Sequence, residues 1–290
     1  MKIKIARPAG FCFGVKRAIN IAENTLKQLK AKDNIYSLGP IIHNPQVVDA
    51  LCKKGLQVIN SPETIKGGTV IISSHGAPLE LIEGIKKKRA RLIDATCPFV
   101  KYAQNIVRGL KKDGYKIIIV GDSAHPEVKA LRSIAQYADV GTGQCPVPTK
   151  ARGTNAGKRI GIISQTTQNK ADYINEIKKI LEGDFSEIKI FNTICNDTSK
   201  RQSAARSLLK DCDLVIVIGG KNSANTKRLW QICRESGVDS FHIERELELN
   251  EKWFKGKKYV GITSGASTPD SMVKRVGERI KKFNKDKGRE

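Results

Sequence analysis

Short runs of apolar residues recur along the chain, and helical segments separate them. Uninterrupted apolar runs are typical of strands that are buried on both faces, as in a parallel sheet covered by helices. Two of the intervening segments carry an apolar stripe with helical spacing, one from Val15 to Leu29 and one from Phe99 to Leu110. This alternation predicts an α/β protein with small parallel sheets. The uninterrupted apolar runs among the expected strands lie at residues 3–6, 70–73, 116–120, 159–163, 214–218 and 259–263.

The order of elements repeats three times. Each third reads strand, cysteine, helix, strand, polar turn, helix, strand, polar turn, and about 30 residues separate the cysteine from the first polar turn. Because self-similarity at a fixed period defines an architecture, we expect three α/β domains that are related by a pseudo-threefold axis around a common centre. Their predicted bounds are residues 1–95, 96–192 and 193–290.

Two segments fall outside this repeated order. Residues 137–157 are rich in glycine and proline, which predicts a surface excursion inside the second domain. The chain after Lys281 is strongly basic, and we expect this C-terminal tail of the third domain to be frayed.

Length and composition limit the class of protein. A chain of 290 residues is long enough for two or three compact domains. No stretch approaches the roughly 18 to 20 apolar residues of a membrane span, and the N-terminus is charged too early for a signal peptide. We therefore expect a cytoplasmic protein without a membrane partner. In that compartment, seven cysteines predict metal binding, catalysis or core packing rather than disulfides.

The formal net charge of +23 raises the question of a nucleic-acid partner. Here, however, the cations are spread over helices and the tail, aromatic residues make up only 6% of the chain, and no nucleic-acid-binding motif occurs. The pattern is typical of solvated, lysine-rich helix faces, and an acidic small substrate would benefit from the field. A steep salt dependence of RNA binding would support the nucleic-acid alternative.

Histidine, hydroxyl and amide side chains occupy the turns between strands and helices. Taken singly, each has an ordinary alternative role at a helix start, where such residues act as caps. Three of the four histidines, however, lie at equivalent turns, which favours a shared function. Because strand ends and helix N-termini suit phosphate, the turns predict an anion pocket. Its candidate residues are His43, His75, His125, Ser223, Asn225 and Ser267.

Three cysteines lie where a strand ends and a helix follows, a position that favours the thiolate. These are Cys12, Cys97 and Cys195. Cys52 and Cys233 fall on apolar helix stripes and are expected in the core. No C-x-x-C motif occurs, so the chain encodes no local zinc ribbon or ferredoxin-type loop. Three thiolates leave one metal position open. A three-cysteine zinc site is one alternative, and an iron–sulfur cluster whose unique iron binds substrate is the one that thiolate ligation favours.

Nine motifs cover almost the whole chain, from residue 10 to about residue 274. They are GFCFGVKRAI, GPIIHNPQVV, SSHGAP, DATCPFV, GDSAHPEV, SQTTQ, TIC, GGKNSAN and TSGASTPDSMV. In content and order they resemble the motifs of the 4-hydroxy-3-methylbut-2-enyl diphosphate reductase family. That family carries out the last step of the non-mevalonate isoprenoid pathway, in which an allylic diphosphate is reductively dehydroxylated to isopentenyl diphosphate and dimethylallyl diphosphate.

The resemblance implies a central 4Fe–4S cluster with one open iron site that binds the substrate hydroxyl. Its ligands would be Cys12, Cys97 and Cys195. The diphosphate would bind the six residues of the anion pocket. Glu127 matches the family's proton donor, and Thr166 matches the hydroxyl that accompanies it at the substrate. In one departure, Ala224 stands where many members carry a second serine, so one hydroxyl contact is absent.

The expected partners are the allylic diphosphate and an external electron donor of ferredoxin or flavodoxin type, because no flavin or nicotinamide motif is present. We expect a monomer or a weak dimer. Another three-cysteine cluster enzyme, such as quinolinate synthase or the diphthamide-forming enzyme, is an alternative, but its turns would not combine HN, HG and HPE. A non-catalytic iron–sulfur redox sensor is a second alternative, and it would need neither the anion pocket nor Glu127.

Overall fold

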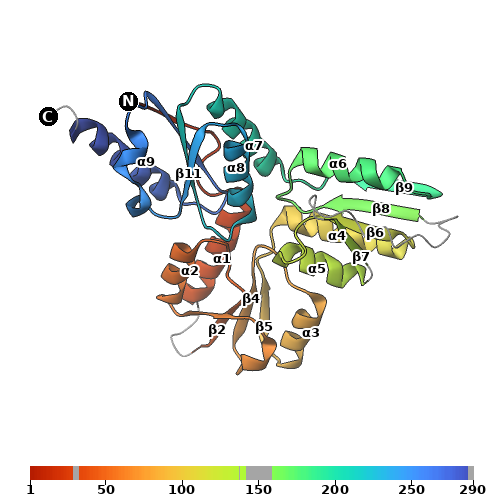
Figure 1. The fold of residues 1–290 in the computed structure, drawn as a ribbon. Coiled ribbons are helices and arrows are strands. Elements are labelled where there is room, and N and C mark those ends of the chain that lie inside the picture. Colours follow the sequence, from red (N-terminus) through yellow and green to blue (C-terminus); the bar gives the residue numbers. More distant parts are fainter. Residues whose placement is uncertain (29–32, 137, 142–158, 287–290) are drawn as a thin grey trace. The chain divides into compact units, whose positions relative to one another are not determined.

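The chain folds into alternating strands and helices that form three four-stranded sheets (Figure 1). The computed structural model describes residues 1–28, 33–136, 138–141 and 159–286. All strand pairs among these residues are parallel. The α/β class with small parallel sheets that the sequence predicts is therefore confirmed.

The chain divides into two compact units, which we describe separately. The first unit comprises Met1–Val15, His43–Pro45 and Asn196–Glu290, and the second comprises Lys16–Ile42 and Gln46–Cys195. The first unit therefore contains both ends of the chain and one sheet, whereas the second contains the other two sheets.

The second unit is built on two sheets of the same design. Their strand orders are β3-β2-β4-β5 and β7-β6-β8-β9. The inner strands are almost wholly buried because helices cover them, which explains their uninterrupted apolar sequences. The strands are β2 (Ile35–Leu38), β3 (Leu56–Ile59), β4 (Thr69–Ile72), β5 (Arg91–Asp94), β6 (Lys116–Val120), β7 (Ala138–Gly141), β8 (Arg159–Ser164) and β9 (Glu187–Phe191). The helices are α1 (Phe13–Gln28), α2 (Pro45–Cys52), α3 (Leu79–Lys87), α4 (Pro98–Lys112), α5 (Pro126–Ala135) and α6 (Lys170–Leu181), of which α1 and α2 begin in the first unit.

The first unit has one sheet with strand order β1-β12-β10-β11. A core of inner-strand side chains, such as Ile216 and Ile262, packs with Val276 and Ile280 of the last helix. The strands are β1 (Lys2–Ile5), β10 (Leu214–Ile218), β11 (Asp239–Ile243) and β12 (Tyr259–Ser264). The helices are α7 (Asn196–Leu209), α8 (Ala224–Glu235) and α9 (Asp270–Asp286).

The three sheets share one strand order, and in each of them the strand that precedes the candidate cysteine is an edge strand. Strand β5 pairs with β4, β9 pairs with β8, and β1 pairs with β12. The N-terminal strand thus completes the sheet of residues 214–264, which begins more than 200 residues further along the chain. The division into three domains near residues 95 and 192 stays a prediction. The strand pairing adds that residues 2–5 belong with the third sheet.

Several local expectations differ from the structure. Strands β3, β7 and β11 were not predicted, because they are edge strands with short sequences of mixed polarity. Strand β7 occupies residues 138–141 of the predicted surface excursion. The rest of that excursion, with Cys145, lies outside the described residues. Helix α9 continues to Asp286 because its apolar stripe continues, with Phe283 against Phe254, so fraying directly after Lys281 is wrong. Cys52, in the last turn of α2, is exposed rather than in the core, whereas Cys233 is buried.

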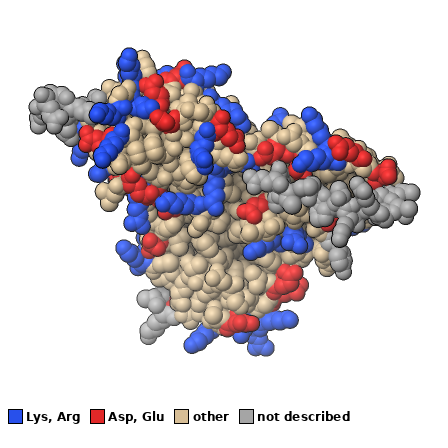
Figure 2. Space-filling model, in the orientation of Figure 1, with Lys and Arg blue, Asp and Glu red and all other residues tan. Residues whose placement is uncertain are grey.

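The surface charge is distributed widely. On the face drawn in Figure 2, Lys and Arg side chains are scattered over the protein with Asp and Glu between them, and they form no single continuous patch there. On this face the cations are therefore distributed as expected for solvated helix faces. None of the helices within the described ranges is both long enough and apolar enough to cross a membrane.

Candidate functional site

A buried carboxyl group lies in the first turn of α5. Glu127 is 1% exposed, and its two oxygens accept hydrogen bonds from the backbone N–H and the hydroxyl of Thr166, each at 2.7 Å. Glu127 comes after β6 and Thr166 comes after β8, and these strands are neighbours in one parallel sheet. The register of the sheet therefore brings the two predicted residues together at its carboxyl edge.

The protonation of Glu127 follows from its burial. Desolvation raises its pKa to about 7, although the two hydrogen bonds from Thr166 act in the opposite direction. At neutral pH the side chain therefore interconverts readily between carboxylic acid and carboxylate. A helix N-terminus favours an acidic residue by only about 0.3–1 kcal/mol, and that role does not require burial. The burial and the raised pKa are what a proton donor needs.

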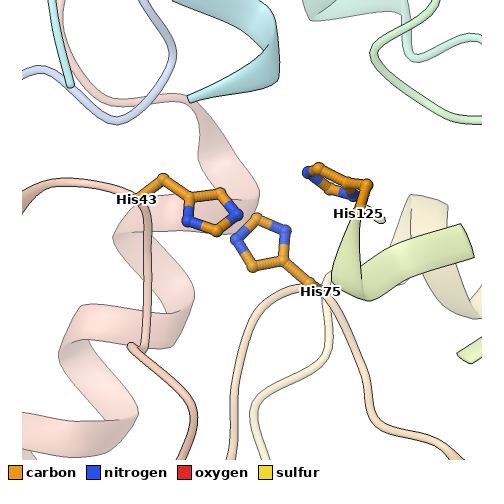
Figure 3. Close-up of side chains that lie close together, drawn as sticks. All are labelled: His43, His75 and His125. Atoms are coloured by element: carbon orange, nitrogen blue, oxygen red, sulfur yellow. The ribbon is translucent and has the colours of Figure 1, made fainter. Parts of the chain in front are cut away.

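His75 and His125, two of the predicted histidines, lie beside each other (Figure 3), and His125 is two residues before this acid. The Nδ1 atom of His125 accepts the backbone N–H of Glu127 at 3.2 Å, so His125 caps α5. This bond leaves Nε2 as the proton-bearing nitrogen of a neutral ring, which can donate to an anion. The ring of His75 lies edge-on to that of His125, with centroids 5.3 Å apart. The turn after His75 is tight, since a Cβ atom on Gly76 would come within 2.6 Å of the Gln104 amide.

In the first unit, the turn before α8 carries polar groups that the protein itself leaves available. Ser223 accepts the N–H of Thr226 at 3.3 Å and so caps the helix, which is the role that serine commonly has before a helix. Asn225 is 4% exposed, and neither its amide nitrogen nor its amide oxygen has a hydrogen-bond partner among the described residues. A buried amide without partners costs free energy unless a ligand supplies them. Asn225 therefore indicates a binding site for a polar group at this helix N-terminus.

The loop that carries His43 is fastened to the start of α9. The hydroxyl of Ser267 donates to the carbonyl of His43 at 3.1 Å, and the Asn44 amide donates to the carbonyl of Ser267 at 2.9 Å. A Cβ atom on Gly220 would lie 2.6 Å from the same His43 carbonyl, so glycine permits this close approach. Burial, and then the charge of Lys227, lowers the pKa of His43, which keeps the ring neutral at physiological pH.

The three predicted cysteines are held by equivalent backbone bonds. The N–H group of each cysteine donates to the carbonyl of the second residue after the neighbouring strand. Cys12 bonds to Ala266 at 3.0 Å, Cys97 to Ser74 at 3.0 Å, and Cys195 to Thr166 at 2.9 Å. Cys12 belongs to the first unit, and Cys97 and Cys195 belong to the second. The repeat in the sequence is thus a repeat in the structure of the strand–helix junction.

The chemistry of these junctions fits a thiolate-bound iron cluster. Each cysteine is partly exposed and directly precedes a helix, where free N–H groups stabilise a thiolate. The N–H group of Val15 already lies 3.5 Å from the sulfur of Cys12, and hydrogen bonds to sulfur tune iron–sulfur clusters. Burial instead raises the pKa of Cys212 and, to about 12, that of Cys233, which makes these two thiols poor ligands.

One residue that supports the site escapes sequence analysis. Arg201 of α7 is 1% exposed, and its guanidinium donates to the carbonyls of Gly10 at 2.8 Å and Ser264 at 3.1 Å and to Asp197 at 2.6 Å. It thereby joins the loop before Cys12 to the end of β12. The sequence of α7 is mostly polar before its last turn, so nothing in its pattern distinguishes Arg201 from a solvated arginine.

These features define a parallel α/β protein with three thiol-bearing strand–helix junctions, polar turns suited to an anion, and a buried acid. Residues 3–281 match the family described as LytB protein, and the chain belongs to this family. Its relatives carry the name that the sequence motifs predicted, so the predicted family is confirmed.

The similarity extends over the full length of these relatives. The 4-hydroxy-3-methylbut-2-enyl diphosphate reductase of Geobacter sulfurreducens is 45% identical over 292 residues, covering 99% of this chain and 100% of that protein. Its counterpart from Aquifex aeolicus is 43% identical and covers 97% of this chain and 96% of that protein. A solved (E)-4-hydroxy-3-methyl-but-2-enyl diphosphate reductase, described as the terminal enzyme of the non-mevalonate pathway, is 42% identical over 97% of this chain and 99% of its own, with a TM-score of 0.69. The E-1-hydroxy-2-methyl-but-2-enyl-4-diphosphate reductase from Plasmodium falciparum is 29% identical over 95% and 86%, with a TM-score of 0.87.

Proposed function

We propose that this chain is an oxidoreductase that converts (E)-4-hydroxy-3-methylbut-2-enyl diphosphate to isopentenyl diphosphate and dimethylallyl diphosphate. The full-length relatives bear the name of this reductase. The observation that carries the proposal is the buried Glu127–Thr166 pair at the carboxyl edge of its sheet. In the reaction, the allylic C–O bond breaks, the oxygen leaves as water, and carbon gains one hydrogen. The balance requires two electrons and two protons.

Three cysteines would hold the cofactor, a 4Fe–4S cluster with one open iron site. They are Cys12, Cys97 and Cys195. When bound, the cluster supplies the electrons and acts as a Lewis acid toward the substrate hydroxyl. The equivalent backbone bonds at the three junctions support this ligand set, as do the partly exposed thiols.

The polar turns would anchor the diphosphate through hydrogen-bond donors. Asn225 offers an amide without a protein partner among the described residues, and the nearby N-terminus of α8 adds N–H groups and the positive end of a helix dipole. His125 offers its Nε2–H group, and His43 acts as a neutral donor. Ser267 would turn its hydroxyl from the His43 carbonyl to the anion. The remaining anchors are His75 and Ser223.

Glu127 would deliver a proton to the departing oxygen. Its raised pKa keeps a large fraction of the side chain protonated at neutral pH, and burial excludes water that would compete for the proton. After the transfer, the new carboxylate accepts the N–H and the hydroxyl of Thr166, which stabilise its charge. The Thr166 hydroxyl also lies beside the substrate oxygen in this proposal, so it can pass the proton or orient the leaving group.

The electrons would come from an external carrier of ferredoxin or flavodoxin type, since the sequence contains no flavin or nicotinamide motif. A cytoplasmic location and a monomeric or weakly dimeric state complete the proposal.

Anaerobic purification tests the cofactor and the reaction together. We expect about four iron and four sulfide ions per chain, and turnover of the allylic diphosphate with dithionite as reductant. A protein that contains zinc instead of iron, or one with full iron content and no turnover, would contradict the proposal.

A further inference from the structure

The solvent-exposed side of α4 carries aromatic side chains near its start and cations further along. Phe99 is 43% exposed and Tyr102 is 58% exposed. The helix also carries Lys101, Arg108, Lys111 and Lys112, and it has no acidic residue. Its other face, from Val100 to Leu110, is buried in the second unit. We call Phe99, Lys101, Tyr102, Arg108 and Lys112 the α4 face; Lys101 is half-buried and paired with Asp94 at 2.7 Å, and the other four are exposed.

The stability of the helix does not explain this composition. Cations in the last turn interact favourably with the helix dipole, which accounts for Lys111 and Lys112. The first turn normally favours acidic residues, yet here it contains aromatic side chains and is followed by Lys101. Exposed aromatic side chains gain nothing from the core, and aromatic residues and arginine are enriched at protein interfaces. Arg108 and Lys112 have no ion-pair partner in the part of the chain that the structure describes.

The location of the α4 face indicates what would bind there. Cys97, a ligand in the proposed function, is the N-cap residue of the same helix, so Phe99 and Tyr102 lie within about one and a half turns of it. Electron transfer falls off steeply with distance, so a carrier has to bind close to a cluster ligand. A carrier with an acidic surface would also be attracted by the net charge of +23.

We propose that the α4 face is the docking surface for a small acidic electron-transfer protein. The inference rests on the proposed function, which consumes two electrons. A one-electron carrier must then bind twice in each turnover: each reduced carrier gives up one electron, leaves oxidised, and makes room for the next. This demands a small, rapidly exchanging interface, as is usual for redox partners. Tyr102 provides its apolar centre, and Arg108 and Lys112 provide its charged rim.

Direct binding gives the first test. An oxidised acidic ferredoxin is titrated into the purified holoprotein by calorimetry at several salt concentrations. We expect the triple variant Tyr102→Ser, Arg108→Glu, Lys112→Glu to weaken binding by about tenfold or more and to flatten the salt dependence. The matched control, Lys178→Glu with Leu181→Ser, removes an exposed cation and a 46%-exposed apolar side chain from α6 of the same unit. It should bind like the wild type.

Turnover with two reductants separates docking from catalysis. The triple variant should lose at least tenfold in kcat/KM with reduced ferredoxin and retain wild-type turnover with dithionite, which needs no docking surface. Equal ferredoxin affinity in the triple variant and the wild type overturns the inference, as does loss of turnover with both reductants. If the wild-type holoprotein fails to reduce the allylic diphosphate with either reductant, the proposed function is wrong. The binding measurements still decide whether an acidic carrier uses the α4 face.

Discussion

At the scale of single residues, the environment of each polar group decides its role. Glu127 and Asn225 are both buried at the start of a helix, but Glu127 has two partners within the protein and Asn225 has none among the described residues. The first is therefore held in place and poised to change its protonation, whereas the second awaits a ligand. A helix cap alone would explain neither arrangement.

Replacing the acid of Glu127 by an amide separates proton delivery from helix stabilisation. Glu127→Gln keeps the size of the side chain but cannot donate a carboxylic proton. We expect the iron content and substrate affinity of the wild type, with kcat reduced about 10²–10⁴-fold in single-turnover and steady-state assays. Near-normal turnover by a variant with full iron content would show that Glu127 only stabilises α5.

The pKa of Glu127 makes turnover depend on pH. Since burial raises this pKa to about 7, the protonated form is plentiful below pH 7 and falls about tenfold for each further pH unit above it. The kcat of the wild type should decline in that range. The raised pKa also makes stability depend on pH. The native state favours the protonated acid more strongly than the unfolded state does, so the free energy of unfolding falls as pH rises from about 4.5 to about 7. Glu127→Gln should therefore gain stability relative to the wild type across that window, as measured by urea unfolding.

Asn225→Ala tests, with two measurements, the role of the buried amide that has no hydrogen-bond partner among the described residues. If Asn225 binds the diphosphate, inhibition by pyrophosphate should weaken by about ten- to a hundred-fold, the value of a hydrogen bond to a charged group. The unfolding free energy should stay constant or rise, because the substitution removes buried polar atoms that lack partners. Asn44→Ala is the control, since the Asn44 amide has a partner in Ser267 and its loss should lower stability.

At the scale of elements, side-chain bonds between distant segments position the cysteine junctions. Cys12 lies on a loop whose shape depends on the carbonyl of Gly10 and on Ser264, and Arg201 of α7 holds both. Gly10 itself adopts a φ of +78°, and a Cβ atom there would lie 1.9 Å from Asp270. The loop therefore requires both glycine and a buried guanidinium.

Arg201→Met should destabilise the first unit. It leaves three carbonyl groups without their charged donor and Asp197 without its cation, for which we expect a loss of about 2–4 kcal/mol in unfolding free energy. Thermal and urea unfolding measure the change. Arg206→Met, at an exposed position of the same helix, should cost less than about 0.5 kcal/mol. Equal effects of the two substitutions would contradict the role assigned to Arg201.

The sequence predicts the elements unevenly, for physical reasons. The inner strands, such as residues 214–218, are buried on both faces, so their apolar runs are unmistakable. The edge strands are half-exposed, and a sequence such as that of β7 resembles a loop. Pairing over long separations is not encoded locally, which is why the place of β1 beside β12 could not be read from the sequence. Arg201 escaped notice because its acceptors are backbone carbonyls that have no sequence signature.

At the scale of the whole molecule, one junction is used three times. In each sheet, an edge strand leads into a cysteine whose N–H group bonds to the neighbouring inner strand or its turn. The repeat and the candidate cysteines could be found from the sequence because the spacing is regular. The division into two units could not be predicted from the sequence, because it depends on contacts between residues far apart in the chain. The equivalent backbone bonds support the proposed three-cysteine ligand set.

The ligand set is tested by removing one thiol at a time. Cys12→Ser, Cys97→Ser and Cys195→Ser should each abolish the brown colour and most of the bound iron, because a hydroxyl is a poor ligand for cluster iron and three thiolates are the minimum in the proposed site. Cys52→Ser is the matched control, since Cys52 lies at the exposed end of α2, away from any strand–helix junction. It should retain full iron and sulfide content. Iron content equal to the wild type in any of the first three variants would exclude that cysteine as a ligand and require a different cluster site.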